Sequence, residues 1–294
     1  MDWLDRMNKA MNYIEAHLTE DISFDEVAKI ACCSTYHFQR MFSFITDVPI
    51  SEYIRRRRLT LAAFGLQATD MKVIDIALKY RYDSPKAFSR AFKNLHGILP
   101  TSARNGGAVL KAYPRMTFQI SIKGDKEMNY RIEKKEKFSV FGITTEICSV
   151  YEQPFIEIPA FWRKCDDDGT IERIEKAAGL KSAERCFGAF FNGRLSMLSY
   201  MLCYYAPQSG VPDGFEYISV PAKTWAIFPA GRNSDIGEIS KQVKQIWKDI
   251  FAQWLPTSQY TLDGEPHFEK FYNLAAGEQK PIYTAEVWIP VKTE

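Results

Sequence analysis

The sequence predicts a multidomain chain, with an all-α domain carrying two helix-turn-helix units followed by an α+β domain. Three observations predict it. A short unit is repeated near the N-terminus, and after about residue 128 helical apolar spacing gives way to alternating aromatic and β-branched residues. The length of 294 residues, with 46% apolar and 25% charged residues, suffices for two globular cores. We expect domains at residues 1–106 and 128–294, joined by a linker at residues 107–127.

Residues 23–104 contain two copies of one short unit. The copies place Phe38, Arg40 and Phe42 in line with Phe88, Arg90 and Phe92, fifty positions further on. Internal repetition identifies a supersecondary unit that is used twice. One copy alone would leave an ordinary three-helix bundle as an equal alternative, and the second copy makes that alternative much weaker.

The first copy is expected to follow a helix over residues 3–18, where apolar residues recur at helical spacing. Ser23, with Glu26 three residues later, has the form of a capping box, so a second helix should begin there. Ser34 is the expected cap of a third helix that ends near Phe44. On this third helix we expect the inward side chains to be Phe38, Met41, Phe42 and Ile45. The side chains expected to face solvent are Thr35, Tyr36, Gln39, Arg40 and Ser43.

Pro49 and Ser51 introduce a basic helix that contains Arg55–Arg58. Some of these arginines should contact phosphates, and one should pack its stem between the two units. A rigid connecting helix would hold the two reading helices ~34 Å apart, one turn of DNA. In the second copy Ser84 should cap the last helix and Pro85 should begin it. The side chains expected to face outward there are Lys86, Ser89, Arg90 and Lys93.

Charge and cysteine usage narrow the function classes. Residues 1–106 carry 15 Lys and Arg against 12 Asp and Glu, and a local basic cluster favours nucleic acid even where the net charge is only +2. The six Cys show no CxxC pair and no His at ligand spacing, so neither a metal site nor a disulfide framework is expected. No signal peptide or membrane span is recognisable, so we expect a cytoplasmic protein. We expect no cofactor.

The first domain resembles the AraC/XylS family of transcription regulators. The matching stretches are HFQRMF at 37–42, YIRRRRL at 53–59 with Ala62, and FSRAFK at 88–93 with Gly97 and Pro100. The resemblance implies double-stranded DNA as the partner, read in the major groove. It assigns base or phosphate contacts to Thr35, Tyr36, His37, Gln39, Arg40, Arg55, Lys86, Ser89 and Arg90. Family members usually carry glycine where this chain has Cys32 and Arg81, and an aromatic residue where it has Ala103.

The second domain shows the pattern β-α-β-β twice. Strands are expected at 138–147, 185–191, 198–205, 224–228, 268–272 and 282–289, with a further edge strand at 116–122. Helices are expected at 154–165 and from Ser234, as cap, to Pro256. The two helices should lie on one antiparallel sheet, leaving a groove along the axis that relates the halves.

Glu286 is the polar residue that stands out in this domain, because the strand around it is otherwise apolar. Strand alternation puts Glu286 and Trp288 on one face. A buried carboxylate is unfavourable unless it is paired, and a ligand cation lying over aromatic rings would supply the partner. The alternative is plain core packing for the aromatic residues, with Glu286 on a solvated face.

The second domain resembles GyrI-like effector-binding domains, through the duplicated pattern, EVWIPV at 286–291 and WLP at 254–256. The resemblance implies a lipophilic, often cationic ligand received by an acidic residue among aromatic ones. It assigns the effector site to Glu286, with Trp162, Phe228, Tyr272, Trp288 and Tyr204 as its walls.

Together the two resemblances imply a transcription activator that senses a small molecule and contacts RNA polymerase, as a monomer or a dimer, with no catalytic residues. Two alternatives stay open. Isolated GyrI-like domains are reported to hydrolyse reactive small molecules, and Glu286 with Tyr272 or Tyr204 could imitate that chemistry. A DNA-binding adaptor without a ligand would require a filled, dry groove.

Overall fold

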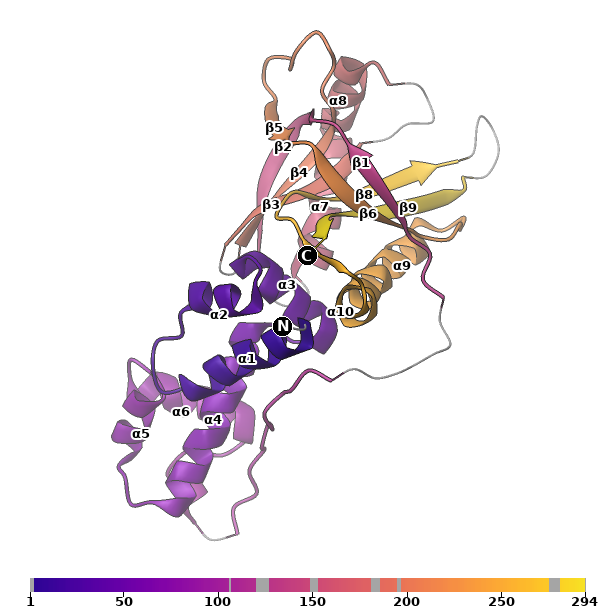
Figure 1. The fold of residues 1–294 in the computed structure, drawn as a ribbon. Helices are drawn as coiled ribbons and strands as arrows, with labels where there is room; N and C mark the ends of the chain where they lie inside the picture. The colour runs from indigo at the N-terminus through magenta and orange to yellow at the C-terminus, as the bar shows by residue number, and fades with distance from the viewer. Residues whose placement is uncertain are drawn as a thin grey trace. The chain divides into compact units, whose positions relative to one another are not determined.

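The computed structural model describes residues 3–105, 107–119, 127–148, 153–180, 186–194, 197–274 and 281–293 (Figure 1). The chain divides into two compact units. The first comprises Met1–Cys32 with Val48–Gln119, and the second comprises Cys33–Asp47 with Ile120–Glu294. The predicted α domain followed by an α+β domain is confirmed as a fold class. The domain boundaries themselves stay a prediction.

The first unit contains α1 (Trp3–Ala16), α2 (Phe24–Ala31), α4 (Ile50–Ala68), α5 (Val73–Lys79), α6 (Pro85–His96) and the 3₁₀ turn η1 (Ser102–Arg104). The caps predicted from the sequence are present: the Ser23 hydroxyl accepts a hydrogen bond from the Glu26 amide, and the Ser84 hydroxyl accepts one from Ala87. Pro85 occupies the first turn of α6, where its missing N–H has no acceptor to lose.

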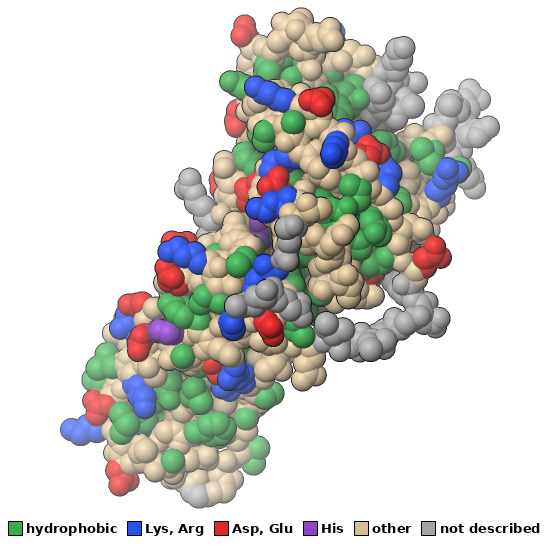
Figure 2. Space-filling view, in the orientation of Figure 1, with side chains coloured by type: hydrophobic (Ala, Val, Ile, Leu, Met, Phe, Trp, Pro, Cys, Tyr) green, Lys and Arg blue, Asp and Glu red, His purple; other side chains and the backbone are tan. Residues whose placement is uncertain are grey.

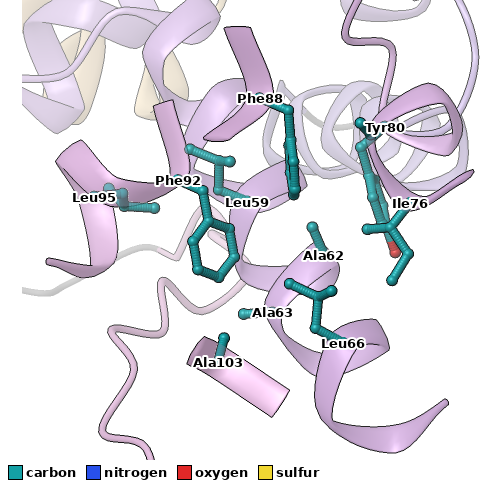
Figure 3. Packing of buried hydrophobic residues seen from close by; sticks show 11 residues of the cluster. Leu59, Ala62, Ala63, Leu66, Ile76, Tyr80, Phe88, Phe92, Leu95 and Ala103 are labelled. Carbon is teal, nitrogen blue, oxygen red and sulfur yellow. The ribbon is translucent and has the colours of Figure 1, made fainter. Parts of the chain in front are cut away.

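Buried apolar residues of α4, α5, α6 and η1 form one core in this unit (Figure 3). Phe88 and Phe92 of α6 lie against Leu59, Ala62 and their neighbours on α4, and both aromatic side chains are fully buried. The two phenylalanines that align with the inward Phe38 and Phe42 of the first copy therefore face inward on α6 as well. Ala103 is also fully buried, so a larger aromatic side chain would not fit there without rearrangement.

Cys32 and Arg81 follow α2 and α5 in the turns where glycine was expected from the family resemblance. Both adopt the left-handed conformation, with φ of 53° and 65°. The turns therefore keep the backbone geometry that favours glycine, and a side chain is carried there at a cost of about 1 kcal/mol.

The second unit contains α3 (Thr35–Thr46) and a nine-stranded antiparallel sheet with its helices. The strands are β1 (Arg131–Lys135), β2 (Phe138–Cys148), β3 (Phe187–Arg194), β4 (Met197–Tyr205), β5 (Glu216–Val220), β6 (Lys223–Pro229), β7 (Tyr260–Leu262), β8 (His267–Asn273) and β9 (Tyr283–Thr293). The helices are α7 (Gln153–Asp167), α8 (Thr170–Ala178), α9 (Ile236–Asp249), the π-helical turn η2 (Ile250–Trp254) and α10 (Leu255–Thr257).

The order of the strands shows the predicted duplication. It is β1-β6-β9-β8-β3-β4-β2-β5, with β7 paired to β9. In one half, β2, α7, β3 and β4 give the order β3-β4-β2. In the other half, β6, α9, β8 and β9 give the same order, β8-β9-β6. The halves meet where β3 pairs with β8.

The sheet curls on itself. Five steps separate β6 from β2 in the strand order, about 24 Å in a flat sheet. Yet the rings of Trp225 on β6 and Phe138 on β2 are only 6.2 Å apart. The enclosed face therefore holds a cluster of buried side chains, and α7, α8 and α9 cover the other face (Figure 1).

Some predicted details are wrong. Asp235, rather than Ser234, caps α9, because the Asp235 carboxylate accepts from the Gly237 amide. Pro256 does not end the helix, because it lies inside α10, the short helix that follows η2. It is among the first residues of α10, where proline is tolerated. Residues 116–119 of the predicted edge strand form no strand, since Phe118 and Asn8 of α1 exchange hydrogen bonds. Residues 120–122 of that predicted strand, and Arg185 at the start of the strand predicted at 185–191, lie outside the described residues.

Candidate functional site

The outward face of α6, the predicted second reading helix, is open to solvent. Lys86, Arg90 and Lys93 are exposed and Ser89 is half-buried. The predicted orientation of these side chains is confirmed, and their contacts with DNA stay a prediction.

The outward face of α3, the predicted first reading helix, is covered. Tyr36 and His37 are each 1% exposed and Gln39 is 8% exposed. The prediction that the reading side chains of α3 face solvent is therefore wrong in this structure, and even Thr35 and Ser43 are half-buried. The cause lies inside the second unit, where α3 contacts β3, α9 and η2.

Arg40 lies at the centre of this contact. Its guanidinium carbon is 3.9 Å from the ring centroid of Trp247 and 4.2 Å from that of Phe190. Its Nη1 donates to the Tyr36 hydroxyl at 2.7 Å, and its Nη2 lies 3.5 Å from Glu269 Oε1. The same carboxylate oxygen accepts a hydrogen bond from Trp247 Nε1. Burial raises the pKa of Glu269, against the opposing effects of Arg40 and Trp247.

His37 forms the second anchor of α3. Its Nε2 is 2.7 Å from Nε2 of His267 on β8, so one ring donates and the other accepts. Burial, with nearby Arg40 and Lys223, lowers the pKa of His37 to about 3, and burial lowers the pKa of His267 as well. The pair is therefore neutral near pH 7.

β3 approaches α3 closely at Gly193. A Cβ atom at this position would lie 1.8 Å from Tyr36 Cγ, so only glycine fits while the contact is formed. At the other end of α3, Lys248 on α9 forms an ion pair with Asp47 at 2.6 Å.

The four arginines of α4 have partners within their own unit. Arg57 bonds to the Glu15 carboxylate at 2.8 Å and to the Tyr113 carbonyl, and Arg58 donates to two backbone carbonyls. Arg55 and Arg56 both bond to Glu52. Arg55 is 39% exposed, so its predicted phosphate contact requires exchange of this partner. Lys and Arg side chains are interspersed with Asp and Glu on the face seen in Figure 2.

Glu286 on β9 already has a cationic partner. Its Oε1 is 2.7 Å from Nη1 of Arg131 on β1, while Oε2 accepts hydrogen bonds from Tyr272 and Trp288 Nε1. Burial raises the pKa of Glu286, but these bonds outweigh it and hold the pKa below its usual value. The sequence suggested an isolated carboxylate because it did not reveal Arg131 as a partner. In the structure the carboxylate is paired.

Lys270 on β8 lies among aromatic rings in the enclosed cluster. Its Nζ is 3.5 Å from the ring centroid of Trp288, 4.7 Å from Tyr205 and 4.8 Å from Phe187. The residue is only 5% exposed and donates to the Tyr205 hydroxyl. Burial lowers the pKa of Lys270 to about 7.

The structure brings some predicted effector residues together and separates others. Glu286, Tyr272 and Trp288 share hydrogen bonds on the enclosed face. Trp162 donates to Tyr200 beneath α7, and Phe228 packs against Trp254 of η2, so both lie on the helix-covered face. Tyr204 contacts Phe187 and borders both clusters.

Lys270 and Arg131 were missed by the sequence analysis. Lys270 is two positions from both Phe268 and Tyr272 on one strand, and this spacing would have placed it on the same face as Tyr272. Nothing in the sequence pairs Arg131 with Glu286, because β1 reaches β9 only through β6.

Within the part of the chain that the structure describes, no three His, Cys, Asp or Glu side chains gather as metal ligands would. A membrane-crossing helix, long and apolar throughout, is likewise not found among these residues.

Comparisons with known proteins match both domains. Residues 131–291, more than half of the chain, match the family described as integron-associated effector binding protein, and residues 27–106 match a helix-turn-helix domain family. Among solved structures, SAV2435 bound to tetraphenylphosphonium covers 56% of this chain and 94% of that one, with 19% identity and a TM-score of 0.46.

Relatives by sequence match the N-terminal region. The HTH-type transcriptional activator AarP of Providencia stuartii is 43% identical over 98 residues, 33% of this chain and 73% of AarP. The transcriptional regulator Rob of Salmonella typhimurium is 40% identical over 104 residues, 35% of this chain but only 36% of Rob. The relatives are transcription regulators, which agrees with the prediction that the chain is not an enzyme. The chain belongs to the AraC-type helix-turn-helix transcription regulators and carries a C-terminal effector-binding domain of the integron-associated, GyrI-like type.

Proposed function

We propose that this chain is a transcription activator whose effector-binding domain controls whether α3 is free to read DNA. The effector is a lipophilic small molecule with a cationic group, bound on the enclosed face of the sheet near Glu286. Activation passes through RNA polymerase, and the activator name of AarP supports that step.

The observation that carries the proposal is the alternation of side chains along β8. His267 and Glu269 point toward α3, where they meet His37 and Arg40. Phe268, Lys270 and Tyr272 point to the opposite face, into or beside the aromatic cluster. A ligand that displaces β8 therefore acts on the residues that hold α3.

The side chains of α3 cannot serve both partners at once. Arg40 and His37 are held by Trp247, Glu269 and His267, whereas base reading requires their donors to face the groove. DNA binding and this contact are therefore alternatives. A ligand shifts the balance only by as much as it prefers one state over the other.

A cationic effector would replace Arg131 at Glu286. Arg131 is 43% exposed and also bonds to Glu133 at 2.6 Å, so it keeps a carboxylate partner after leaving Glu286. The exchange leaves no buried charge unpaired, which is the condition for a favourable buried ion pair.

Trp225 gives the effector a second contact point. Its indole nitrogen is buried in the aromatic cluster and lacks a hydrogen-bond acceptor among the described residues. A buried donor without a partner costs roughly 1–3 kcal/mol. An effector that carries an acceptor as well as a cation would recover this energy.

Calorimetric titration of the full chain with tetraphenylphosphonium tests the ligand class. We expect saturable binding that weakens about 10- to 100-fold in Glu286→Gln, in line with the ~1.5–3 kcal/mol of a charged contact. Glu216→Gln, an exposed carboxylate on β5, is the matched control and should bind normally. Equal affinity of all three proteins would exclude Glu286 as the charge partner. Absence of binding to any lipophilic cation would favour the adaptor without a ligand.

The coupling to α3 is tested with a DNA duplex that the wild-type chain selects from a random pool. Saturating tetraphenylphosphonium should raise the affinity for this duplex, and the increase should be absent in Glu286→Gln. Binding of the cation with unchanged DNA affinity would refute the coupling while leaving the sensor intact.

A further inference from the structure

Lys270 occupies an aromatic cage of the kind that binds organic cations. Its ammonium lies against Trp288, Tyr205 and Phe187, and Phe268 closes the cage at 5.6 Å. Aromatic faces within about 6 Å of a cation attract it electrostatically, and such cages recognise quaternary ammonium ligands. The enclosed face is therefore shaped for a cation, and a side chain of the protein itself fills it.

The ammonium is poorly matched to this position. It has three N–H donors, and Tyr205 is the single hydrogen-bond partner found for it among the described residues. Glu286 lies directly opposite Lys270 in the β8–β9 register, yet its carboxylate is engaged by Arg131, Tyr272 and Trp288. An onium group has no N–H donors, so in this cage it would leave no hydrogen bond unmade, whereas the lysine ammonium leaves donors unpaired.

We propose that the Lys270 ammonium occupies the subsite of the effector's cationic group, so that effector and proton compete for one aromatic cage. The inference rests on the proposed function, since it concerns the same ligand. The cation enters when Lys270 gives up its proton to solvent and its neutral amine moves aside. The charge in the cage is then exchanged, with no added repulsion between ligand and lysine.

Two carboxylates that face Lys270 stay charged near neutrality, because hydrogen bonds hold the pKa of Glu133 on β1 and of Glu286 on β9 low. Lys135 on β1 forms an ion pair with Glu133. The shared hydrogen bonds keep Arg131 charged by raising its pKa. The neutral groups are Cys203, Tyr205 and Tyr272, whose pKa values burial raises. A pH effect between 6 and 8 is therefore assigned to Lys270, whose pKa of about 7 lies in that range.

The affinity for tetraphenylphosphonium should rise as the pH rises. With a pKa of about 7, the fraction of Lys270 that is neutral grows about tenfold between pH 6 and pH 8, and the apparent affinity grows with it. Calorimetry on the full chain at pH 6, 7 and 8 and constant ionic strength measures this slope. Lys270→Met, which keeps the apolar stem, should bind more tightly than wild type at pH 6 and lose the slope.

Lys134→Met is the matched control, because Lys134 is exposed on β1 and its removal changes the net charge equally. It should keep the slope of the wild type. Proton release gives a measurement on the unaltered chain, in case Lys270→Met does not fold. Titrations at pH 7 in phosphate and in Tris should show release of about half a proton per bound cation.

The outcomes separate this inference from the proposed function. Binding without a pH slope and without proton release would overturn the competition but leave the cation sensor standing. A slope that survives in Lys270→Met would assign the titration to another group and overturn the inference as well. Absence of binding by the wild type at every pH would overturn both.

Discussion

α3 and α6 are copies of one sequence unit, and they differ in what covers their outward faces. Each begins after a serine whose hydroxyl accepts a hydrogen bond from an amide three residues later. Each carries an arginine at the matching position, but Arg90 is exposed, whereas the Arg40 side chain is 9% exposed. The same serine cap and the same residue spacing thus give the same helix in two different environments.

The residues of the two outward faces explain the difference. At the three positions where α3 carries Tyr36, His37 and Phe44, α6 carries Lys86, Ala87 and Asn94. Aromatic side chains bury much apolar surface, and Phe44 stacks on Trp247 with ring centroids 5.8 Å apart. The outward face of α3 is therefore suited to packing against a protein surface. The outward face of α6 lacks these aromatic side chains and is not suited to such packing.

The largest expected effect comes from forcing α3 off the sheet. In Gly193→Ala the added methyl group would overlap the Tyr36 ring, and overpacking of this kind costs about 1–3 kcal/mol or more. If the covered form limits DNA binding, the variant should bind the selected duplex more tightly than wild type, by roughly 5- to 150-fold. Fluorescence anisotropy with labelled duplex measures the change.

Gly231→Ala provides the control for this variant. Its added methyl group meets only side-chain atoms of Gln242, at 3.1 Å, far from α3 in the sequence and on no element that contacts Tyr36, so DNA affinity should not change. A loss of DNA affinity in Gly193→Ala, with the far-ultraviolet circular dichroism retained, would contradict the idea that the contact opposes DNA binding.

The matching arginines should respond unequally to removal. Arg90→Ala should weaken binding to the selected duplex by about 1–3 kcal/mol, because its exposed side chain is predicted to contact DNA. Arg40→Ala should weaken it less, since the loss of a base contact is offset by a weaker hold on α3 from Trp247 and Glu269. Arg40→Ala should also blur base preference in its half of the site. Equal losses, or a larger loss for Arg40→Ala, would argue that the covered form is not populated.

The sequence predicted most of the helices and caps and the duplicated sheet, because these depend on residues near each other in the chain. The Ser23 and Ser34 caps and the twofold β-α-β-β pattern are examples. Strand alternation also placed Glu286 and Trp288 on one face, and the resemblance to GyrI-like domains added Tyr272, which lies on the adjacent strand.

What the sequence did not predict depends on contacts between distant segments. The cover on α3 comes from β3, β8 and α9, more than 140 positions away. The partner of Glu286 is Arg131, which joins it across β6. Lys270 reads as an ordinary strand lysine until the curl of the sheet encloses it. Burial of a polar group follows from tertiary packing, which periodicity describes on one element at a time.

The smallest expected effect is on pH, through the His37–His267 pair that only the covered helix has. Both pKa values are lowered from about 6.5 by burial, with His37 at about 3. The covered form is therefore fully stabilised above about pH 6.5 and loses stability as the pH falls toward 3. The loss is up to about 1.4 kcal/mol per histidine for each pH unit. Urea unfolding of the full chain at pH 7.5 and 5.5 measures it, and His267→Asn should show a smaller difference between the two pH values. Equal differences in the two proteins would show that the pair does not stabilise the covered form.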